Sequence, residues 1–185
     1  ATIEKGASVT ASRNEAGHAA GGAIILKGDG AELVVRDTGT TVTFEENCAA
    51  ISGGAVHASS GGTFSFLRGA RVLMVRNVCK LYGQGMSLEA AFLFVEGRGT
   101  KLEIEGCRHV LTGFCILESS HKGGSRNGGG LNTFTGSRVV MKAGAEIEIR
   151  HHAVWVGGGG LAINDGSLKV SGKDTQVSLK IPITV

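Results

Sequence analysis

The chain has 185 residues, including 31 glycines and one proline, and its 19 basic and 16 acidic side chains give a net charge of +3. Charges of both signs are interspersed without a run of either sign, which argues against a nucleic-acid partner or a membrane-surface role. The longest strongly apolar run, 90–95, is too short to cross a bilayer, which argues against direct membrane insertion.

A unit of thirty residues recurs along the chain. Three segments align without gaps, and each opens with a glycine that lies 30 residues after the previous one; they are 39–56, 69–86 and 99–116. Weaker copies, 6–24 and 144–161, precede and follow them. A fixed period of this length indicates a solenoid that forms one domain over residues 1–185.

Each unit contains three short segments with strand patterns. In the unit that begins at Gly39, apolar residues alternate with polar ones over 40–46, and two further apolar segments follow at 55–59 and 63–68. Alternation with a period of two predicts strands with one buried face, and no segment carries a helical stripe over ten or more positions. We therefore predict an all-β fold, a right-handed single-stranded parallel β-helix with three faces and five to six coils.

Stacked coils bring equivalent residues together in columns. We expect three columns of inward side chains: Val42, Val72, Leu102 and Ile147; Phe44, Met74, Ile104 and Ile149; and Val56, Met86, Ile116 and Leu161. By the same alternation His57, between two inward positions, is predicted to face outward.

One coil is longer than the others, because Gly99 and Gly144 are 45 residues apart. The excess is assigned to 119–137, between the second and third strands, and its polar, glycine-rich composition predicts a loop that leaves the rod. Insertions in repeat proteins often carry binding. The loop therefore supplies the best candidate contact residues: His121, Lys122, Arg126 and Asn127.

Three asparagines, Asn14, Asn47 and Asn77, occupy one position of the repeat. An inward asparagine at a tight turn can bond to the next asparagine and to the turn backbone, so we predict a stacked structural ladder, with ligand binding as the alternative.

The cysteines leave two alternatives open. Cys48 and Cys79 differ by one position of the repeat, and they are either small buried side chains or form a disulfide between neighbouring coils. Four cysteines allow three pairings, and no CxxC pair indicates zinc.

His151 and His152 lie near Trp155. Adjacent strand residues point to opposite faces, so the two imidazoles are not expected to share a metal. The alternatives are contact with a sugar or a turn beside a packed tryptophan. No metal or other cofactor is predicted for the chain.

The first units carry two short motifs: GGA followed by an aliphatic residue at 21–24 and 53–56, and FEEN at 44–47. The two motifs and their order resemble the repeats of the chlamydial polymorphic outer membrane proteins. Those repeats are marked by GGA followed by Ile, Leu or Val, and by FxxN. Later copies in this chain are degenerate. The resemblance implies a right-handed β-helix that is displayed at a cell surface and used in adhesion.

Many parallel β-helices act on polysaccharides, so a catalytic function is the alternative to a structural one. Such enzymes need clustered acidic residues, and the one acidic doublet, Glu45–Glu46, is not repeated in register. We predict no catalytic residues. The expected function is that of a non-catalytic segment of a secreted or cell-surface protein, an adhesin, spacer or structural element that contacts a glycan or a neighbouring surface protein. The alternative is a carbohydrate-active β-helix enzyme. We also expect the segment to belong to a longer chain or to stack end to end, since neither end carries a capping helix.

Overall fold

The computed structural model describes residues 1–79, 81–106, 130–150 and 160–180. These residues form twenty strands and no helix, so the described part of the chain has no helix that could cross a membrane. The all-β prediction is confirmed.

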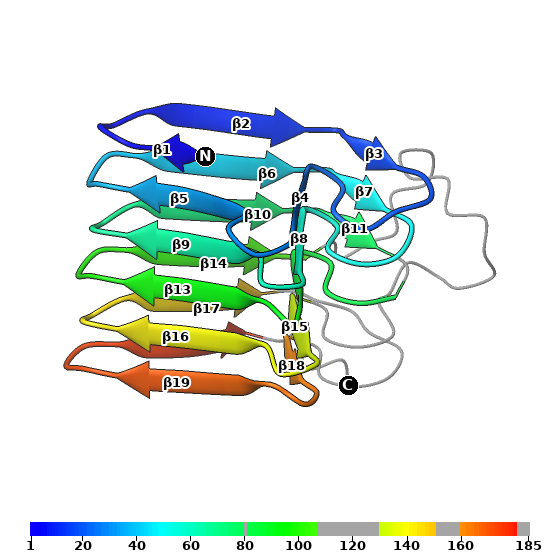
Figure 1. Ribbon diagram of the computed structural model, residues 1–185. Coiled ribbons are helices and arrows are strands. Elements are labelled where there is room, and N and C mark those ends of the chain that lie inside the picture. The colour runs from blue at the N-terminus through cyan, green and yellow to red at the C-terminus, as the bar shows by residue number, and fades with distance from the viewer. Residues whose placement is uncertain (80, 107–129, 151–159, 181–185) are drawn as a thin grey trace.

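The strands form four parallel sheets, which we name A to D (Figure 1). Sheet A stacks β1 (Thr2–Ile3), β5 (Glu32–Arg36), β9 (Thr63–Leu67), β13 (Phe92–Glu96), β16 (Arg138–Lys142) and β19 (Ser167–Ser171). Sheet B stacks β2 (Ser8–Ser12), β6 (Thr41–Glu45), β10 (Arg71–Val75), β14 (Lys101–Glu105), β17 (Glu146–Arg150) and β20 (Gln176–Lys180). Sheet C stacks β3 (Glu15–Ala16), β7 (Cys48–Ala49) and β11 (Val78–Cys79). Sheet D stacks β4 (Ile24–Lys27), β8 (Val56–Ser59), β12 (Met86–Glu89), β15 (Leu131–Phe134) and β18 (Leu161–Ile163).

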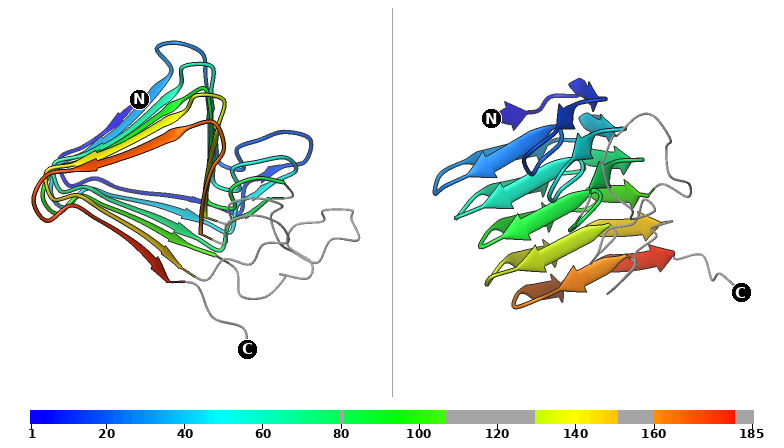
Figure 2. Two further views of the ribbon diagram at one scale, coloured as in Figure 1. Left: turned by 90° about the horizontal axis from the view of Figure 1, so that it is seen from below. Right: turned by 90° about the vertical axis from the view of Figure 1, so that its right-hand side faces the viewer.

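Successive strands of the chain belong to different sheets, so each passage around the molecule adds one strand to every long sheet. The view along the axis in Figure 2 shows three walls, formed by sheets A, B and D, and Figure 1 shows that the chain winds with a right-handed sense. The predicted three-faced, right-handed parallel β-helix is confirmed. The short sheet C, at the corner between B and D, is an addition to the three predicted strands.

Apolar columns fill the interior. Val72 pairs in register with Val42 and Leu102, and Leu102 pairs with Ile147, as the repeat predicts. The second predicted column, which begins at Phe44, is likewise paired in register and is at most 1% exposed. Burying each such side chain stabilises the fold by about 1.5–3 kcal/mol, so the stacked columns are the main source of stability.

The third column corrects the predicted position of the long coil's insertion. Residues 107–129, which include Ile116 and most of the predicted loop at 119–137, lie outside the described residues. Leu131–Phe134, however, form β15, where Leu131 pairs with Met86 and takes the place predicted for Ile116. The fifteen extra residues therefore precede the second strand of this coil instead of following it. The sequence of β15, LNTF, gives a weak strand signal, because Leu131 is its one strongly apolar inward residue.

Candidate functional site

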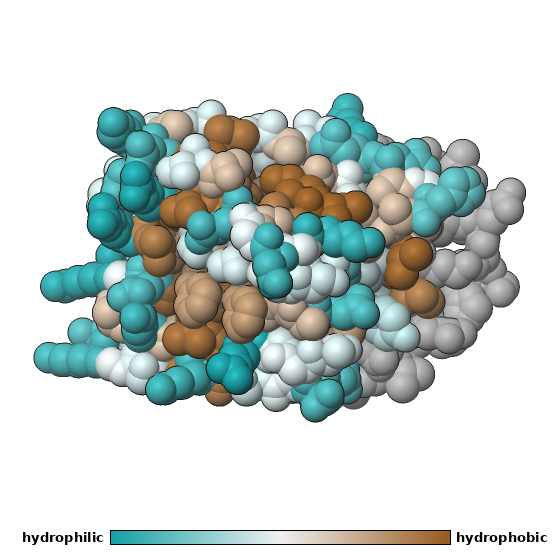
Figure 3. Space-filling view, in the orientation of Figure 1, coloured by the Kyte–Doolittle hydropathy of each residue, from teal (hydrophilic) through white to brown (hydrophobic). Residues whose placement is uncertain are grey.

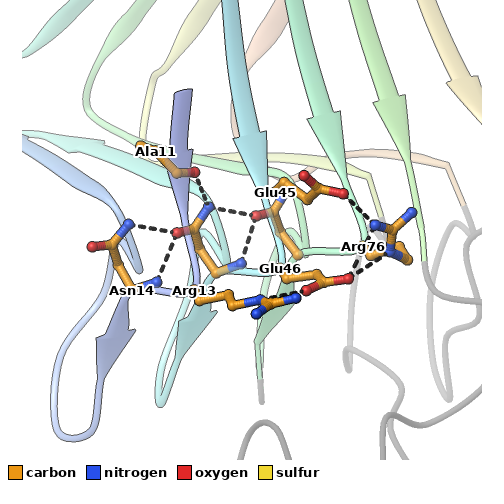
Figure 4. Close-up of polar contacts among 8 residues, drawn as sticks. Ala11, Arg13, Asn14, Glu45, Glu46 and Arg76 are labelled. Carbon is orange, nitrogen blue, oxygen red and sulfur yellow. Dashed lines mark hydrogen bonds and ion pairs between the residues drawn. The ribbon is translucent and has the colours of Figure 1, made fainter. Parts of the chain in front are cut away.

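The corner between sheets B and C is held by a ladder of three asparagine side chains (Figure 4). Asn14 donates from its main-chain and side-chain nitrogens to Oδ1 of Asn47, at 3.0 and 2.8 Å. Asn47 donates in the same way to Oδ1 of Asn77, at 3.0 and 2.9 Å. Side-chain amides of Asn47 and Asn77 also donate to the carbonyl oxygens of Ala11 and Phe44. The structure thus brings together the three asparagines that share a position in the repeat.

The middle of this ladder has no capacity for a ligand. Asn47 is fully buried, its Oδ1 accepts two hydrogen bonds and its Nδ2 donates two. Those four bonds use both donors and both lone pairs of the amide. At Asn47 the geometry therefore supports the structural reading and not the binding alternative.

Charged side chains stack on the outer side of the same corner (Figure 4). Arg13, Glu46 and Arg76 immediately precede the asparagines and have left-handed φ angles of 56°, 54° and 52°. Glu46 accepts hydrogen bonds of 3.0 Å from Nε of Arg13 and of Arg76, and Arg76 also pairs with Glu45. Hydrogen bonds from Arg13 and then Arg76 hold the pKa of Glu46 below its ordinary value. The acidic doublet is therefore engaged in ion pairs.

A second charged cluster covers the outer face of sheet B. Nζ of Lys101 lies within 2.8–3.5 Å of a carboxylate oxygen of each of three residues, Glu103, Glu146 and Glu148. Burial disfavours the charged form of Lys101, but the hydrogen bonds to Glu103 and Glu148 outweigh it and raise the pKa of Lys101. Burial likewise opposes ionisation of Glu103, and Lys101 and Arg71 overcome it and lower the pKa of Glu103. Both groups stay charged at neutral pH.

The candidate binding site is a hollow of about 350 Å³ on the outer face of sheet D. Figure 2 shows the turns between sheets C and D projecting outward past sheet D, and the hollow lies against strands β4, β8 and β12. Its polar lining comes from outward strand positions and an adjoining turn: Lys27, His57, Ser59, Ser60 and Glu89. Ile25, 47% exposed, and Ala20 supply the apolar lining.

His57 faces outward from β8, as alternation predicts, yet it is only 6% exposed. Its Nδ1 lies 3.3 Å from Oγ of Ser52, within hydrogen-bonding distance. Burial lowers the pKa of His57, although the charge of Glu89 acts in the opposite direction. The imidazole is therefore neutral at pH 7 and carries one donor and one acceptor. Ser52 is 3% exposed, so its hydroxyl is not presented to substrate as a nucleophile would be.

A polar column continues from the hollow into the next coils. His57 pairs in register with Ser87, and Ser87 pairs with Asn132. Ser87 and Asn132 are fully buried, yet Oγ of Ser87 and Nδ2 of Asn132 have no hydrogen-bond partner among the described residues. A buried polar group without a partner costs about 1–3 kcal/mol, and such groups are few in native proteins. Oδ1 of Asn132 still accepts a hydrogen bond of 3.2 Å from Nδ2 of Asn164, so the column is satisfied only in part by the described residues.

The hollow offers groups that can recognise a polar partner. Lys27 offers a cation, Glu89 an anion, and Ser59 and Ser60 offer hydroxyls beside the apolar surface of Ile25. These groups suit hydrogen bonds and ion pairs to a partner. Within the described residues no group of three or more His, Cys, Asp or Glu side chains is placed to hold a metal ion.

Several predicted site residues fall outside the described part of the chain: His121, Lys122, Arg126, Asn127, His151 and His152. Of the two alternatives for Cys48 and Cys79, a disulfide between them is wrong, because Cys48 is disulfide-bonded whereas Cys79 is a small buried side chain with a thiol. The register gives the reason: Cys48 pairs with Val78, and Cys79 pairs with Ala49. Adjacent strand positions point to opposite faces, so the two sulfur atoms diverge. Cys107 and Cys115 lie outside the described residues.

Sequence reasoning missed Lys27, Ser52 and Glu89. The signal was present, since the second strands of three units align as 24–27, 56–59 and 86–89, and they place Lys27 and Glu89 at one outward position. Comparison of the chain with family models, with curated proteins and with solved structures gives no match.

Proposed function

We propose that this chain is a non-catalytic β-helix segment of a secreted or cell-surface protein, which acts in adhesion or as a structural spacer. The observation that carries the proposal is the ion pairing of two outward carboxylates, Glu46 and Glu103, and of Lys101. Glu46 and Glu103 both have a lowered pKa, and Lys101 has a raised one.

Polysaccharide hydrolysis needs a carboxylic acid that stays protonated, which requires a raised pKa. A lyase needs a basic side chain that can take up a proton, which a lysine held in its charged form cannot do. The pKa values of Glu46 and Glu103 are lowered, which is the opposite of what hydrolysis requires. The pKa of Lys101 is raised, which is the opposite of what a lyase requires. These clusters therefore favour a role in which charges stabilise and decorate the rod.

Two further observations support a surface role. The GGA and FxxN positions by which the chain resembles the polymorphic outer membrane proteins serve the coil itself: Phe44 is buried in the core and Asn47 is the centre of the ladder. The disulfide at Cys48 is typical of proteins that fold outside the cytosol. The polar hollow on sheet D supplies a contact surface that adhesion requires.

The test combines retention with turnover. The 185-residue chain is applied to a glycan array and to immobilised extracellular proteins, and every polysaccharide offered is then assayed for new reducing ends and for unsaturated products. We expect retention without turnover. Lys27→Glu, which reverses a charge of the hollow, should weaken retention, whereas Lys5→Glu, at a side chain 83% exposed, should not. Turnover of any polysaccharide contradicts the proposal in favour of the carbohydrate-active enzyme.

A further inference from the structure

We propose that the outer face of sheet A, around Phe92 and Phe94, binds an acidic saccharide chain. This inference rests on the proposed adhesive function and names the chemistry of the partner. It concerns a different wall of the solenoid from the hollow on sheet D, so the two surfaces can be tested separately.

Two aromatic rings stand on the outside of β13. Leu93 and Val95 point inward and are fully buried, so the alternation of the strand directs Phe92 and Phe94 outward. Their ring planes are 11° apart and their centroids are 6.4 Å apart. Two nearly parallel phenylalanine rings on an outward strand face serve no core, because the core of this coil lies on the other side of the sheet.

Neighbouring strands extend this surface. Phe94 pairs in register with Val140 on β16 and with Ser65 on β9, and Ser65 pairs with Val34 on β5. Figure 3, which views this wall, shows apolar side chains gathered over the middle of sheet A and hydrophilic ones along its side edge. The result is a half-buried, mainly apolar strip that runs across several coils and is interrupted by the buried Ser65.

The charges beside the strip are mainly positive toward β16 and β19, whereas the anion Glu32 lies at its β5 end and accepts a hydrogen bond from Ser65. On the outer face of β13, β16 and β19 lie three cations, Arg138, Lys142 and Lys169, and one anion, Glu96. Glu96 is already paired with Lys142 at 3.1 Å. Arg138, which pairs in register with Phe92, and Lys169, which pairs with Val140, are exposed and form no ion pair with any described residue.

A saccharide with anionic groups matches both features. The negative face of an aromatic ring attracts the C–H groups on the flat side of a sugar ring, and Arg138 and Lys169 can bind carboxylate or sulfate groups. Phe94 and Lys169 lie two strand spacings apart, roughly 10 Å, so a linear chain that crosses the coils would meet rings first and cations next. An uncharged apolar partner would leave the cations unused.

The test is titration calorimetry of the 185-residue chain with a uronate hexasaccharide and with the same chain after methyl esterification of its carboxylates. We expect the acidic chain to bind more tightly than the ester. Phe94→Leu, which keeps apolar volume but removes the ring, should weaken binding about threefold to tenfold. Arg138→Gln should weaken binding to the acidic chain about threefold and leave the ester unaffected. Leu73→Ala, at an outward position of β10 on sheet B and outside the strip, is the control, and thermal melting checks that each variant is folded.

Three results would overturn the inference: no binding of the acidic chain, full binding by Phe94→Leu, or equal binding of oligothymidylate, which would indicate attraction of any polyanion. None of these results contradicts the proposed adhesive function if the chain is still retained through the hollow of sheet D. Cleavage of the bound saccharide would have the converse meaning, since it would contradict the non-catalytic function while the binding surface remained.

Discussion

Single residues decide how closely the coils of this solenoid can approach. Gly54 of the GGA motif packs its α-carbon against the next coil, and Asn47 is bonded to the coils on both sides. A Cβ at position 54 would meet backbone atoms of the adjacent coil, and a side chain without an amide at position 47 would lose the hydrogen bonds to its neighbours. Two substitutions test this view.

Gly54→Ala should destabilise the protein by about 2–4 kcal/mol, because its Cβ would lie 2.2 Å from the carbonyl oxygen of Gln84 and 2.7 Å from the nitrogen of Val78. Urea unfolding followed by circular dichroism measures the loss. Gly17→Ala is the matched control: a Cβ there meets nothing within 4 Å, and we expect a change within about 0.5 kcal/mol. Equal midpoints for the two variants would show that the GGA corner does not require glycine.

Asn47→Ala should cost about 3 kcal/mol in the free energy of unfolding, because it removes the acceptor of Asn14 and the donors to Asn77 and Ala11 within a buried corner. Asn14→Ala, at the exposed end of the ladder, should cost about 1 kcal/mol. The same urea titration compares the two. A smaller loss at position 47 than at position 14 would mean that the ladder is not cooperative.

At the scale of strands, the period of the repeat predicted which residues stack, and the structure follows it wherever a strand carries two strong apolar positions. The pairs Val42–Val72 and Phe44–Met74 are examples. The predicted position of the insertion was wrong because this signal is weak in β15, whose inward positions are Leu131 and Thr133. The hollow on sheet D was not foreseen, because it depends on how turns between sheets project, which the repeat period does not encode.

The charge cluster on sheet B gives a prediction about acidity. The folded pKa of Glu103 is lowered, so its contribution to stability is present above the ordinary carboxyl pKa near 4.5 and is lost as pH falls below that value. Lys101→Gln removes the main charged partner of Glu103. We expect this variant to be less stable at pH 7 and to lose less additional stability on acidification between pH 5 and pH 3, measured by thermal melting across that range.

Lys142→Gln is the control for this cluster, since its pair with Glu96 involves side chains that are 47% and 41% exposed. Exposed pairs contribute little, so its melting curve should follow that of the parent protein at every pH. A parallel pH dependence for Lys101→Gln and the parent would show that Lys101 does not hold Glu103 in its charged form.

For the whole molecule, a stack in which each coil contacts only its neighbours predicts that stability varies along the axis. Inward residues of the middle coils, such as Phe64 and Leu93, are fully buried, whereas Val9, Val170 and Leu179 in the outermost described coils are 39%, 45% and 48% exposed. The outer coils therefore lose less apolar burial when they open. In the 185-residue chain we expect amide hydrogen exchange to be slowest in β9 and β13 and at least about tenfold faster in β2 and β19. Exchange at one common rate in all four strands would instead indicate that the coils open together, because every local opening would then require unfolding of the entire stack.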